Sequence, residues 1–397
     1  MRFLLHSIGT MGDVWPFVAL GHTLERLGHS AIFALNRNEQ FEYVGSLTVA
    51  PIGPLVKRQF FKQTLTEMNR EEDIDAQWER FYRAMEFAVP GMYYDLTALS
   101  ETIDAIICSR FCFAAHMVHE KTGIPLINIS LVELEEWASG SKAGCAEIVN
   151  RCRESLGFTG MHDPFSNNPG SELLSIVAVS PGLTHLDPRR APGFFYLPSK
   201  PFVPSQELEE FISDGEKPIV VTLGSMTPDD PGGLTAILVD AIGRCGRRAL
   251  IQRGWGRLGM TTGLTPSHVK FIGPVPHEWL FAQTELVIHH SGAGTTAACL
   301  RSGVPSIQVP FLLDQHYWAR LCMEFGSAVA TIPMKDLSSD ALAREITTAL
   351  QHYDDYLDRA RCAAAIICGE AGVAGAASMI VTAVEQSRLL VSNRRSL

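Results

Sequence analysis

The chain has 397 residues, 46% of them hydrophobic, and its 43 acidic and 33 basic residues give a net charge of −10. One hydrophobic core rarely grows beyond about 250–300 residues, so a chain of this length is expected to form two domains. Binding to nucleic acid relies on a basic surface, and the acidic balance disfavours it. The composition therefore favours a two-domain protein with small-molecule partners and no nucleic acid.

Cysteine usage and the apolar segments bear on the cellular compartment. The nine cysteines show no paired spacing, which is typical of reduced thiols and not of a disulfide framework or a metal site. The first residues, MRFLLHSIG, have a strand pattern and not the pattern of a secretion signal. The apolar run 362–384 is interrupted by Gly369, Glu370, Gly372 and Gly375, which indicates helix, turn and helix instead of a membrane span. We expect a cytoplasmic protein.

Strand and helix patterns alternate through the first 130 residues. Residues 2–9 are an apolar run that ends at glycine, residues 14–28 have apolar positions at helical spacing, and residues 30–35 return to strand chemistry. Similar apolar runs at 104–109 and 125–130 favour parallel strands joined by helices. Between them, the polar and aromatic segment 57–87 has helical periodicity. We expect a mobile insertion there that shapes a substrate site.

A change in composition marks the predicted domain boundary. Residues 194–218 carry four prolines, acidic residues and few strand formers, as an interdomain connection does. A second series of strand patterns follows, at 218–225, 248–255, 269–275, 285–292 and 305–311. We predict an N-terminal domain at 1–200, a linker at 201–217, a C-terminal domain at 218–375, and a C-terminal helix at 376–397 that is a candidate to cross back. Both domains are expected to be α/β, doubly wound and Rossmann-like, and to face each other across a cleft.

The strand-to-helix corner at residues 287–296 has the composition of an anion site. In open α/β sheets ligands bind beyond the carboxyl ends of the strands, where a helix N-terminus offers unpaired N–H groups and a partial positive charge. Gly292 and Gly294 let the backbone approach an anion, Thr295 can donate a hydroxyl hydrogen bond, and His290 can donate a ring N–H. The same residues also fit a buried strand followed by a helix with threonine as its N-cap.

The run HHSGAGTTAACLRSGVPSIQVPFLLDQHYWA, residues 289–319, resembles the nucleotide-sugar signature of family 1 glycosyltransferases, in the branch that contains antibiotic, sterol and rhamnolipid glycosyltransferases. Further segments match in the family's order: SIGTMGDVWPFVALGHTLERLGH, VTLGSM, IQRGWG and FIGPVPHEWLF. The resemblance covers most of the chain. It implies the GT-B fold, with the sugar donor in the C-terminal domain and the acceptor in the N-terminal domain.

The resemblance also implies roles for individual positions. A carboxylate suits a sugar because it accepts two hydroxyl donors at once with charge-assisted strength. The implied sets are Ser225, His290, Gly292, Gly294 and Thr295 at the diphosphate, Trp255 and Val275 at the nucleoside, and Asp314 and Gln315 at the sugar.

Three positions depart from the family pattern. Ser291 stands where a glycine is usual and is expected to be tolerated, whereas Met11 stands where an arginine is common and bears on the acceptor side. Ala298 aligns with the glutamate that binds the ribose hydroxyls in the plant branch. The choice between uridine and thymidine diphosphate therefore stays open.

Asp13 is the candidate catalytic base. Glycosyl transfer to a hydroxyl needs a group that removes its proton as the anomeric carbon develops oxocarbenium character. Asp13 lies just beyond the first strand, where an α/β site opens, and the resemblance implies that an aspartate here is the base of an inverting displacement. In the plant branch a histidine works with a distant aspartate, and Ser109 aligns with that aspartate, which agrees with a carboxylate that acts directly. Asp13 also fits the cap of a helix beginning near Val14 and Pro16, and the two roles are compatible.

Weaker patterns in the insertion and nearby are interpreted as structural. Asp73 and Asp75 form a D-x-D triplet in a polar helical segment, where a solvated acidic face is the ordinary interpretation, so no metal is expected. His116 and His119 have no evident further ligand. Aromatic residues of the insertion are candidates either for an apolar acceptor pocket or for core packing, and basic residues beside them are candidates for contact with a membrane surface. The aromatic set is Phe60, Phe61, Trp78, Phe81 and Tyr82, and the basic set is Lys57, Arg58 and Lys62.

These inferences lead to one hypothesis with two alternatives. The chain is expected to be a metal-independent, inverting glycosyltransferase without a cofactor, using a UDP-sugar or dTDP-sugar as co-substrate. The acceptor is expected to be a hydroxyl of an apolar small molecule, such as a natural product, or of a lipid. The alternatives are a nucleotide-sugar epimerase of the same fold and a non-catalytic accessory protein of a glycosyltransferase.

Overall fold

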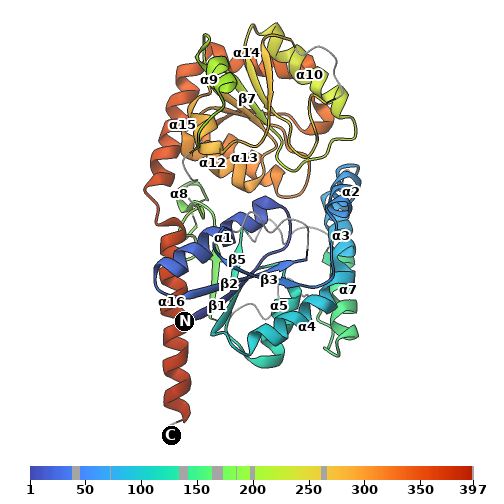
Figure 1. Cartoon of the computed structure of the whole chain (residues 1–397), viewed down its shortest axis with the longest axis vertical. Helices are drawn as coiled ribbons and strands as arrows, with labels where there is room; N and C mark the ends of the chain where they lie inside the picture. Colours follow the sequence, from blue (N-terminus) through green and yellow to red (C-terminus); the bar gives the residue numbers. More distant parts are fainter. Residues whose placement is uncertain are drawn as a thin grey trace. The chain divides into compact units, whose positions relative to one another are not determined.

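The computed structural model describes residues 1–37, 45–71, 73–133, 142–162, 173–184, 186–196, 202–260 and 266–395. The chain divides into two compact units, each with its own sheet (Figure 1). Unit 1 consists of Met1–Leu197 together with Glu370–Leu397, and unit 2 consists of Pro198–Gly369.

Within the described residues, unit 1 is built on a six-stranded parallel sheet with the order β3-β2-β1-β4-β5-β6. The central strands are almost completely buried, which is typical of a parallel sheet covered by helices on both faces. Its strands are β1 (Arg2–His6), β2 (Ser30–Asn36), β3 (Thr48–Ile52), β4 (Ala105–Ser109), β5 (Leu126–Ser130) and β6 (Leu174–Val177).

Side chains that alternate along β1 enter two different core layers of unit 1. Phe3 and Leu5 pack in one layer with residues of α1 (Met11–Arg26) and α16 (Gly372–Arg395). Leu4 packs in the other layer with residues of α4 (Val89–Ser100) and α5 (Phe113–Thr122). This period of two is what a strand buried on both faces requires. The remaining helices of unit 1 are α2 (Arg58–Asn69), α3 (Ile74–Met85), η2 (Glu86–Ala88), α7 (Lys142–Ser155) and α8 (Pro181–Thr184).

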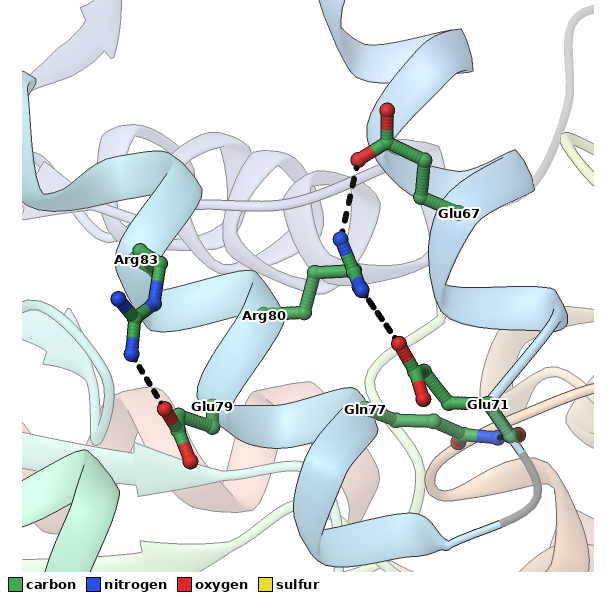
Figure 2. Close-up of polar contacts among 6 residues, drawn as sticks. All are labelled: Glu67, Glu71, Gln77, Glu79, Arg80 and Arg83. Carbon is green, nitrogen blue, oxygen red and sulfur yellow. Dashed lines mark hydrogen bonds and ion pairs between the residues drawn. The ribbon is translucent and has the colours of Figure 1, made fainter.

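The segment predicted as an insertion forms the helices α2 and α3, which pack against each other. Figure 2 shows Arg80 of α3 between two carboxylates, with Glu67 of α2 at 3.2 Å from Nη1 and Glu71 on its other side. The buried Gln77 donates from Nε2 to the main-chain oxygen of Glu71 at 2.9 Å. The helical periodicity is confirmed, and the mobility stays a prediction.

Unit 2 repeats the same architecture. Its described residues form a six-stranded parallel sheet with the order β12-β11-β10-β7-β8-β9. The strands are β7 (Ile219–Thr222), β8 (Ala249–Gln252), β9 (Val269–Ile272), β10 (Leu286–His289), β11 (Ser306–Gln308) and β12 (Ala328–Thr331). The helices are α9 (Gln206–Ser213), α10 (Pro231–Arg244), α11 (His277–Ala282), α12 (Ala293–Ser302), α13 (Gln315–Phe325), η3 (Met334–Asp336), α14 (Ser339–Gln351) and α15 (Tyr353–Cys368). Two doubly wound α/β units were predicted, and this fold class is confirmed.

The end of the chain returns from unit 2 to unit 1. The run Tyr353–Leu390 has the length and apolar composition of a membrane-crossing helix. It consists of α15 and α16, separated by a break after Cys368, so the predicted helix, turn and helix are confirmed. In α16, Ala376, Ile380 and Val384 are buried in the unit 1 core, and α16 lies beside α1 (Figure 1). These three residues of α16 therefore pack into unit 1, while 28% of the most apolar 18-residue window of the run Tyr353–Leu390 is buried.

The compact units differ in their limits from the predicted boundaries. Residues 202–217, predicted as most of the linker, belong to unit 2 and contain α9, whose Leu208 is buried in the unit 2 core. Residue 201 lies outside the described residues. The return to unit 1 begins at Glu370, before the predicted start of the C-terminal helix at 376.

Candidate active site

Two neighbouring strands of unit 2 end at the predicted diphosphate corner. β7 and β10 pair in parallel, with Thr222 opposite His289, so the loops that follow them leave the sheet side by side. The loop after β10 leads into α12, whose N-cap is Gly292 and whose start has no side-chain cap. Thr296 donates the first intrahelical N–H, to Gly292, so the N–H groups before it have no partner within the helix. The alternative with threonine as N-cap is wrong, because Thr295 and Thr296 lie inside the first turn.

The start of α12 combines an exposed backbone with buried hydroxyl groups. Gly294 is exposed, whereas Thr295 is 7% exposed and Thr296 is fully buried. The hydroxyl oxygen of Thr296 has no hydrogen-bond partner among the described residues. Unpaired N–H groups and the partial positive charge of the helix end favour an anion here.

The ring of His290 lies between two glycines. A methyl group added at Gly292 would meet His290 Nε2 at 2.4 Å, and one added at Gly224 would meet His290 Cε1 at 2.8 Å. Gly224 also has a φ of +55°, which glycine adopts without strain. Burial, with a smaller contribution from the nearby His277, lowers the pKa of His290 to about 4 although a backbone hydrogen bond at Thr222 opposes the shift, so the ring is neutral at pH 7. The glycines therefore determine where this ring lies.

The neighbouring His289 and Ser291 have structural roles in the same corner. His289 is fully buried, and its Nδ1 accepts from Ser291 N at 3.1 Å. Ser291 has a φ of +62°, a conformation that a non-glycine residue rarely adopts. Its hydroxyl donates to Gln308 Oε1 at 2.7 Å, and Gln308 Nε2 donates to Ser306 at 2.8 Å. These bonds join the ends of β10 and β11 and hold the serine that stands where a glycine is usual.

The predicted sugar-binding pair lies at the start of α13. Asp314 is the N-cap residue, and its Oδ2 accepts from Trp318 Nε1 at 3.1 Å. Gln315 is 3% exposed, and its Oε1 accepts from the N–H groups of Phe311 at 2.8 Å and Leu312 at 3.3 Å. Its Nε2 lies 3.1 Å from the sulfur of Met226. Gln315 thus holds its own loop near the end of β7, and its contact with a sugar stays a prediction.

The predicted nucleoside positions lie in loops beside the corner. Trp255 donates its main-chain N–H to the oxygen of Gly224 at 3.1 Å, which joins the loops after β7 and β8. Ser225, beside Gly224, is partly exposed. The main-chain oxygen of Val275 accepts from Gln252 Nε2 at 3.2 Å. Ser225, Trp255, His290 and the start of α12 therefore gather at one edge of the unit 2 sheet.

Asp13 lies at the start of α1, beyond the end of β1 in unit 1. Its Oδ2 accepts from Thr10 N at 2.7 Å and from Thr10 Oγ1 at 3.2 Å, and its main-chain oxygen accepts from Ser7 Oγ at 2.8 Å. Asp13 is the third residue of α1 and forms a capping box with the N-cap Thr10. The predicted cap role of Asp13 at a helix start near Val14 is wrong, because α1 begins at Met11. Desolvation raises the pKa of Asp13 to about 6, although the two bonds from Thr10 lower it.

A hollow in unit 1 is lined by side chains from α3, α7 and the loops after β1 and β4. Phe81 and Tyr82 of the predicted aromatic set line it, together with Ile8, five residues before Asp13. The lining residues are mostly apolar. Trp78 instead packs against Phe81 and Tyr82.

The signals that the sequence led us to discount have local roles. Asp73 is the N-cap of α3 and accepts from the N–H of Asp75 at 3.1 Å. His116 is 2% exposed, and its Nε2 lies 4.0 Å from the sulfur of Cys108. His119 Nδ1 lies 2.6 Å from the oxygen of Ile124. These contacts give the residues local structural roles, and the absence of a metal there stays a prediction.

Two features of the site were missed in the sequence. Thr10 lies three residues before Asp13, and this T-x-x-D spacing is close to the capping-box pattern that could have revealed the contact. Gly224 lies 66 residues before His290, and no local signal links them.

Comparison with known proteins identifies both halves of the chain. The family model described as Glycosyltransferase family 28 N-terminal domain matches residues 3–132, and that described as Erythromycin biosynthesis protein CIII-like, C-terminal domain matches residues 250–378. The chain is 28% identical to a sterol 3-beta-glucosyltransferase of Arabidopsis thaliana, over 95% of this chain and 64% of that protein. It is 26% identical to the O-mycaminosyltylonolide 6-deoxyallosyltransferase of Streptomyces fradiae, over 96% of this chain and 97% of that protein. The chain spans less than two thirds of the length of the plant and yeast sterol glucosyltransferases it matches.

A solved structure shows the same fold. The glycosyltransferase SsfS6 of Streptomyces sp. SF2575, complexed with thymidine diphosphate, matches 96% of this chain and 99% of its own at a TM-score of 0.68 and 22% identity. Both sheets and the surrounding helices are those of the GT-B fold. The chain therefore has the GT-B fold, its two halves match the two family models in the same order along the sequence, and it is similar to sterol and antibiotic glycosyltransferases.

Proposed function

We propose that the chain transfers a sugar from a uridine or thymidine diphosphate sugar to a hydroxyl group of an apolar natural product or lipid, in the cytoplasm. The observation that carries the proposal is the start of α12, which has no side-chain cap and lies beside the glycine-framed ring of His290. Helix N–H groups and a ring N–H are suitable donors to a leaving diphosphate. These N–H groups and the partial positive charge of the helix N-terminus can stabilise the negative charge of the leaving diphosphate, so we propose a reaction without a metal ion.

Asp13 is the proposed base. Thr10 donates to its Oδ2, while no other described residue donates to Oδ1. As the acceptor oxygen forms its bond to the anomeric carbon, the bond from that carbon to the diphosphate oxygen breaks and its electron pair leaves with the diphosphate. The acceptor proton passes to Asp13 and then to solvent. Attack on the face opposite the leaving group inverts the anomeric configuration.

An apolar acceptor suits the surroundings of Asp13. The hollow lined by Phe81, Tyr82 and Ile8 is in the same unit, and Ile8 belongs to the loop that leads to Asp13. The hollow has room for about one water molecule, so it supplies apolar surroundings and not the acceptor site itself. Relatives named for transfer to a sterol and to a macrolide derivative support a bulky, mostly apolar acceptor. A sugar hydroxyl or peptide acceptor has less support.

A donor screen tests the binding half of the proposal. The melting temperature of the full chain is measured with uridine or thymidine diphosphate and with sugars linked to either diphosphate. Adenosine diphosphate is the control nucleotide. At a concentration a hundredfold above Kd, a bound donor stabilises the folded chain by about 2.7 kcal/mol, which a thermal shift readily detects. We expect a shift with one of the pyrimidine nucleotides. Equal shifts with all nucleotides, or none with any, would contradict a pyrimidine nucleotide site.

The pH dependence of the reaction tests the base. Because the pKa of Asp13 is raised to about 6 from 3.8, the carboxylate that accepts the proton is lost as the pH falls through about 6. The acid limb of kcat/KM reports the free enzyme, so we expect this limb near pH 6 instead of near pH 4. Measurement of kcat/KM between pH 4.5 and 9, at constant ionic strength, decides the matter. A profile that stays flat down to about pH 4.5 would show that Asp13 is not desolvated or not the base.

A further inference from the structure

The hydrogen bonds of Asp13 are unevenly divided between its two carboxylate oxygens. Oδ2 accepts both the main-chain N–H and the hydroxyl of Thr10, at 2.7 and 3.2 Å. Among the described residues, no other residue donates to Oδ1, although the main-chain N–H of Asp13 itself also faces the carboxylate. The carboxylate also packs directly over Gly9, where an added methyl group would lie 2.2 Å from Oδ2. Gly9 has a φ of +131°, so the backbone here is shaped to leave this space.

We propose that Thr10 is a positioning residue for the transfer reaction, which fixes Oδ2 of Asp13 so that Oδ1 takes the proton of the acceptor hydroxyl. The inference rests on the proposed role of Asp13 as the base. Two donors that converge on one oxygen restrict rotation of the carboxylate about the Cβ–Cγ bond of Asp13. The oxygen without a partner is then the one available to the substrate, in one orientation, before the substrate arrives.

Thr10 also affects the charge on Asp13. Its two hydrogen bonds favour the ionised carboxylate and so oppose the desolvation that raises the pKa of Asp13. The other titratable group recorded as facing Asp13, within the described part of unit 1, is Cys112 at the start of α5. Burial raises the pKa of the Cys112 thiol to about 12, so this thiol is neutral throughout the range of the reaction. Cys112 therefore does not contribute to the acid limb, and changes at Thr10 are expected to act on this limb through Asp13.

The test compares Thr10→Val, which removes the hydroxyl at nearly constant size, with Thr10→Ser, which keeps it. The backbone N–H remains in both. For Thr10→Val we expect the acid limb of kcat/KM to move up by about one pH unit, so that activity at pH 5 falls roughly tenfold relative to the unchanged chain. The KM for the donor is expected to stay the same. Thr10→Ser is expected to restore the wild-type profile.

A matched control separates positioning from helix capping. Ser338 caps α14 in unit 2, where its hydroxyl accepts from Ala341 N at 3.2 Å. Ser338→Ala is expected to lower the melting temperature, as loss of a cap does, and to leave the pH profile unmoved. If Thr10→Val proves unstable, Thr10→Ala removes the same hydroxyl, and rates are normalised to the folded fraction.

The outcomes distinguish this inference from the proposed function. If Thr10→Val and Thr10→Ala melt earlier but keep the wild-type acid limb, Thr10 is a helix cap only and the inference is overturned. If Asp13→Asn leaves turnover unchanged, the base assignment itself fails, whatever Thr10 does. If Asp13→Asn removes turnover and the limb moves in both Thr10 variants, with rescue by serine, the positioning role is supported.

Discussion

Replacement of Asp13 by asparagine is expected to lower turnover at least about tenfold, with a loss of up to about 10²–10⁴-fold typical of a general base. The amide has nearly the shape of the carboxylate and still offers an oxygen to Thr10, but it cannot accept the acceptor proton at neutral pH. The affinity for the donor is expected to remain, because the proposed donor site lies in unit 2. Measurement of kcat, KM and donor Kd for Asp13→Asn separates the chemical step from binding.

The stability of the same variant serves as its control. The pKa of Asp13 is raised on folding, so protonation of this group stabilises the folded chain below pH 4, and that contribution is lost as the pH rises through about 6. At pH 7.5 the wild type therefore holds a desolvated charge that asparagine does not carry. We expect Asp13→Asn to melt no earlier than the wild type at this pH. Turnover at the wild-type level in a folded variant would end the assignment of Asp13 as base.

Much of the structure of the proposed donor corner was predictable because its signals are local. The glycines, threonines and histidines between His289 and Thr296 are contiguous, and an apolar strand before them and a helix after them have periodic patterns. The position of the corner at the carboxyl edge of a parallel sheet follows from general rules of α/β folds. The place of Asp13 after β1 was predictable in the same way, whereas the helix start was predicted near Val14 and lies at Met11.

What the sequence could not indicate depends on contacts between distant segments. The pairing of β7 with β10 brings Gly224 against His290, and nothing in either segment alone specifies that contact. Gln315 offers a second example. A side chain with two donors and an acceptor suits a sugar as well as a loop, and only the fold shows that its acceptor oxygen is used by Phe311 and Leu312. The amide nitrogen of Gln315 is the group that can still donate a hydrogen bond to a ligand.

The domain boundaries were also hard to predict because they depend on contacts between distant segments. Proline and acidic residues indicated a linker at 201–217, yet the acidic residues Glu207, Glu209 and Glu210 lie on the exposed side of α9, whose Leu208 enters the unit 2 core. Composition reports how polar a segment is on average. It does not report that one apolar side chain in that segment is buried against another part of the chain.

Gly292→Ala is expected to weaken binding of the nucleoside diphosphate roughly 10- to 100-fold. The added methyl group would lie 2.4 Å from His290 Nε2, a distance at which the ring must move. Gly292 has a φ of −67°, so alanine is not strained by its backbone, and the effect acts through the ring. Loss of one hydrogen bond to a charged group costs about 1.5–3 kcal/mol, which corresponds to the expected change in Kd. Titration calorimetry with the preferred diphosphate measures it.

A second glycine provides the matched control for this prediction. Gly243, in α10 of the same unit, also faces a histidine, and a methyl group there would lie 3.0 Å from His268 Nε2. Gly243 is exposed, and alanine in a helix is favoured over glycine by about 0.5–1 kcal/mol, so Gly243→Ala is expected to fold well and bind the diphosphate normally. His290→Ala combined with Gly292→Ala should add little to either change, because both remove the same contact. If Gly292→Ala binds as tightly as Gly243→Ala, His290 does not hold the diphosphate, and the anion must be sought at another loop of the sheet edge.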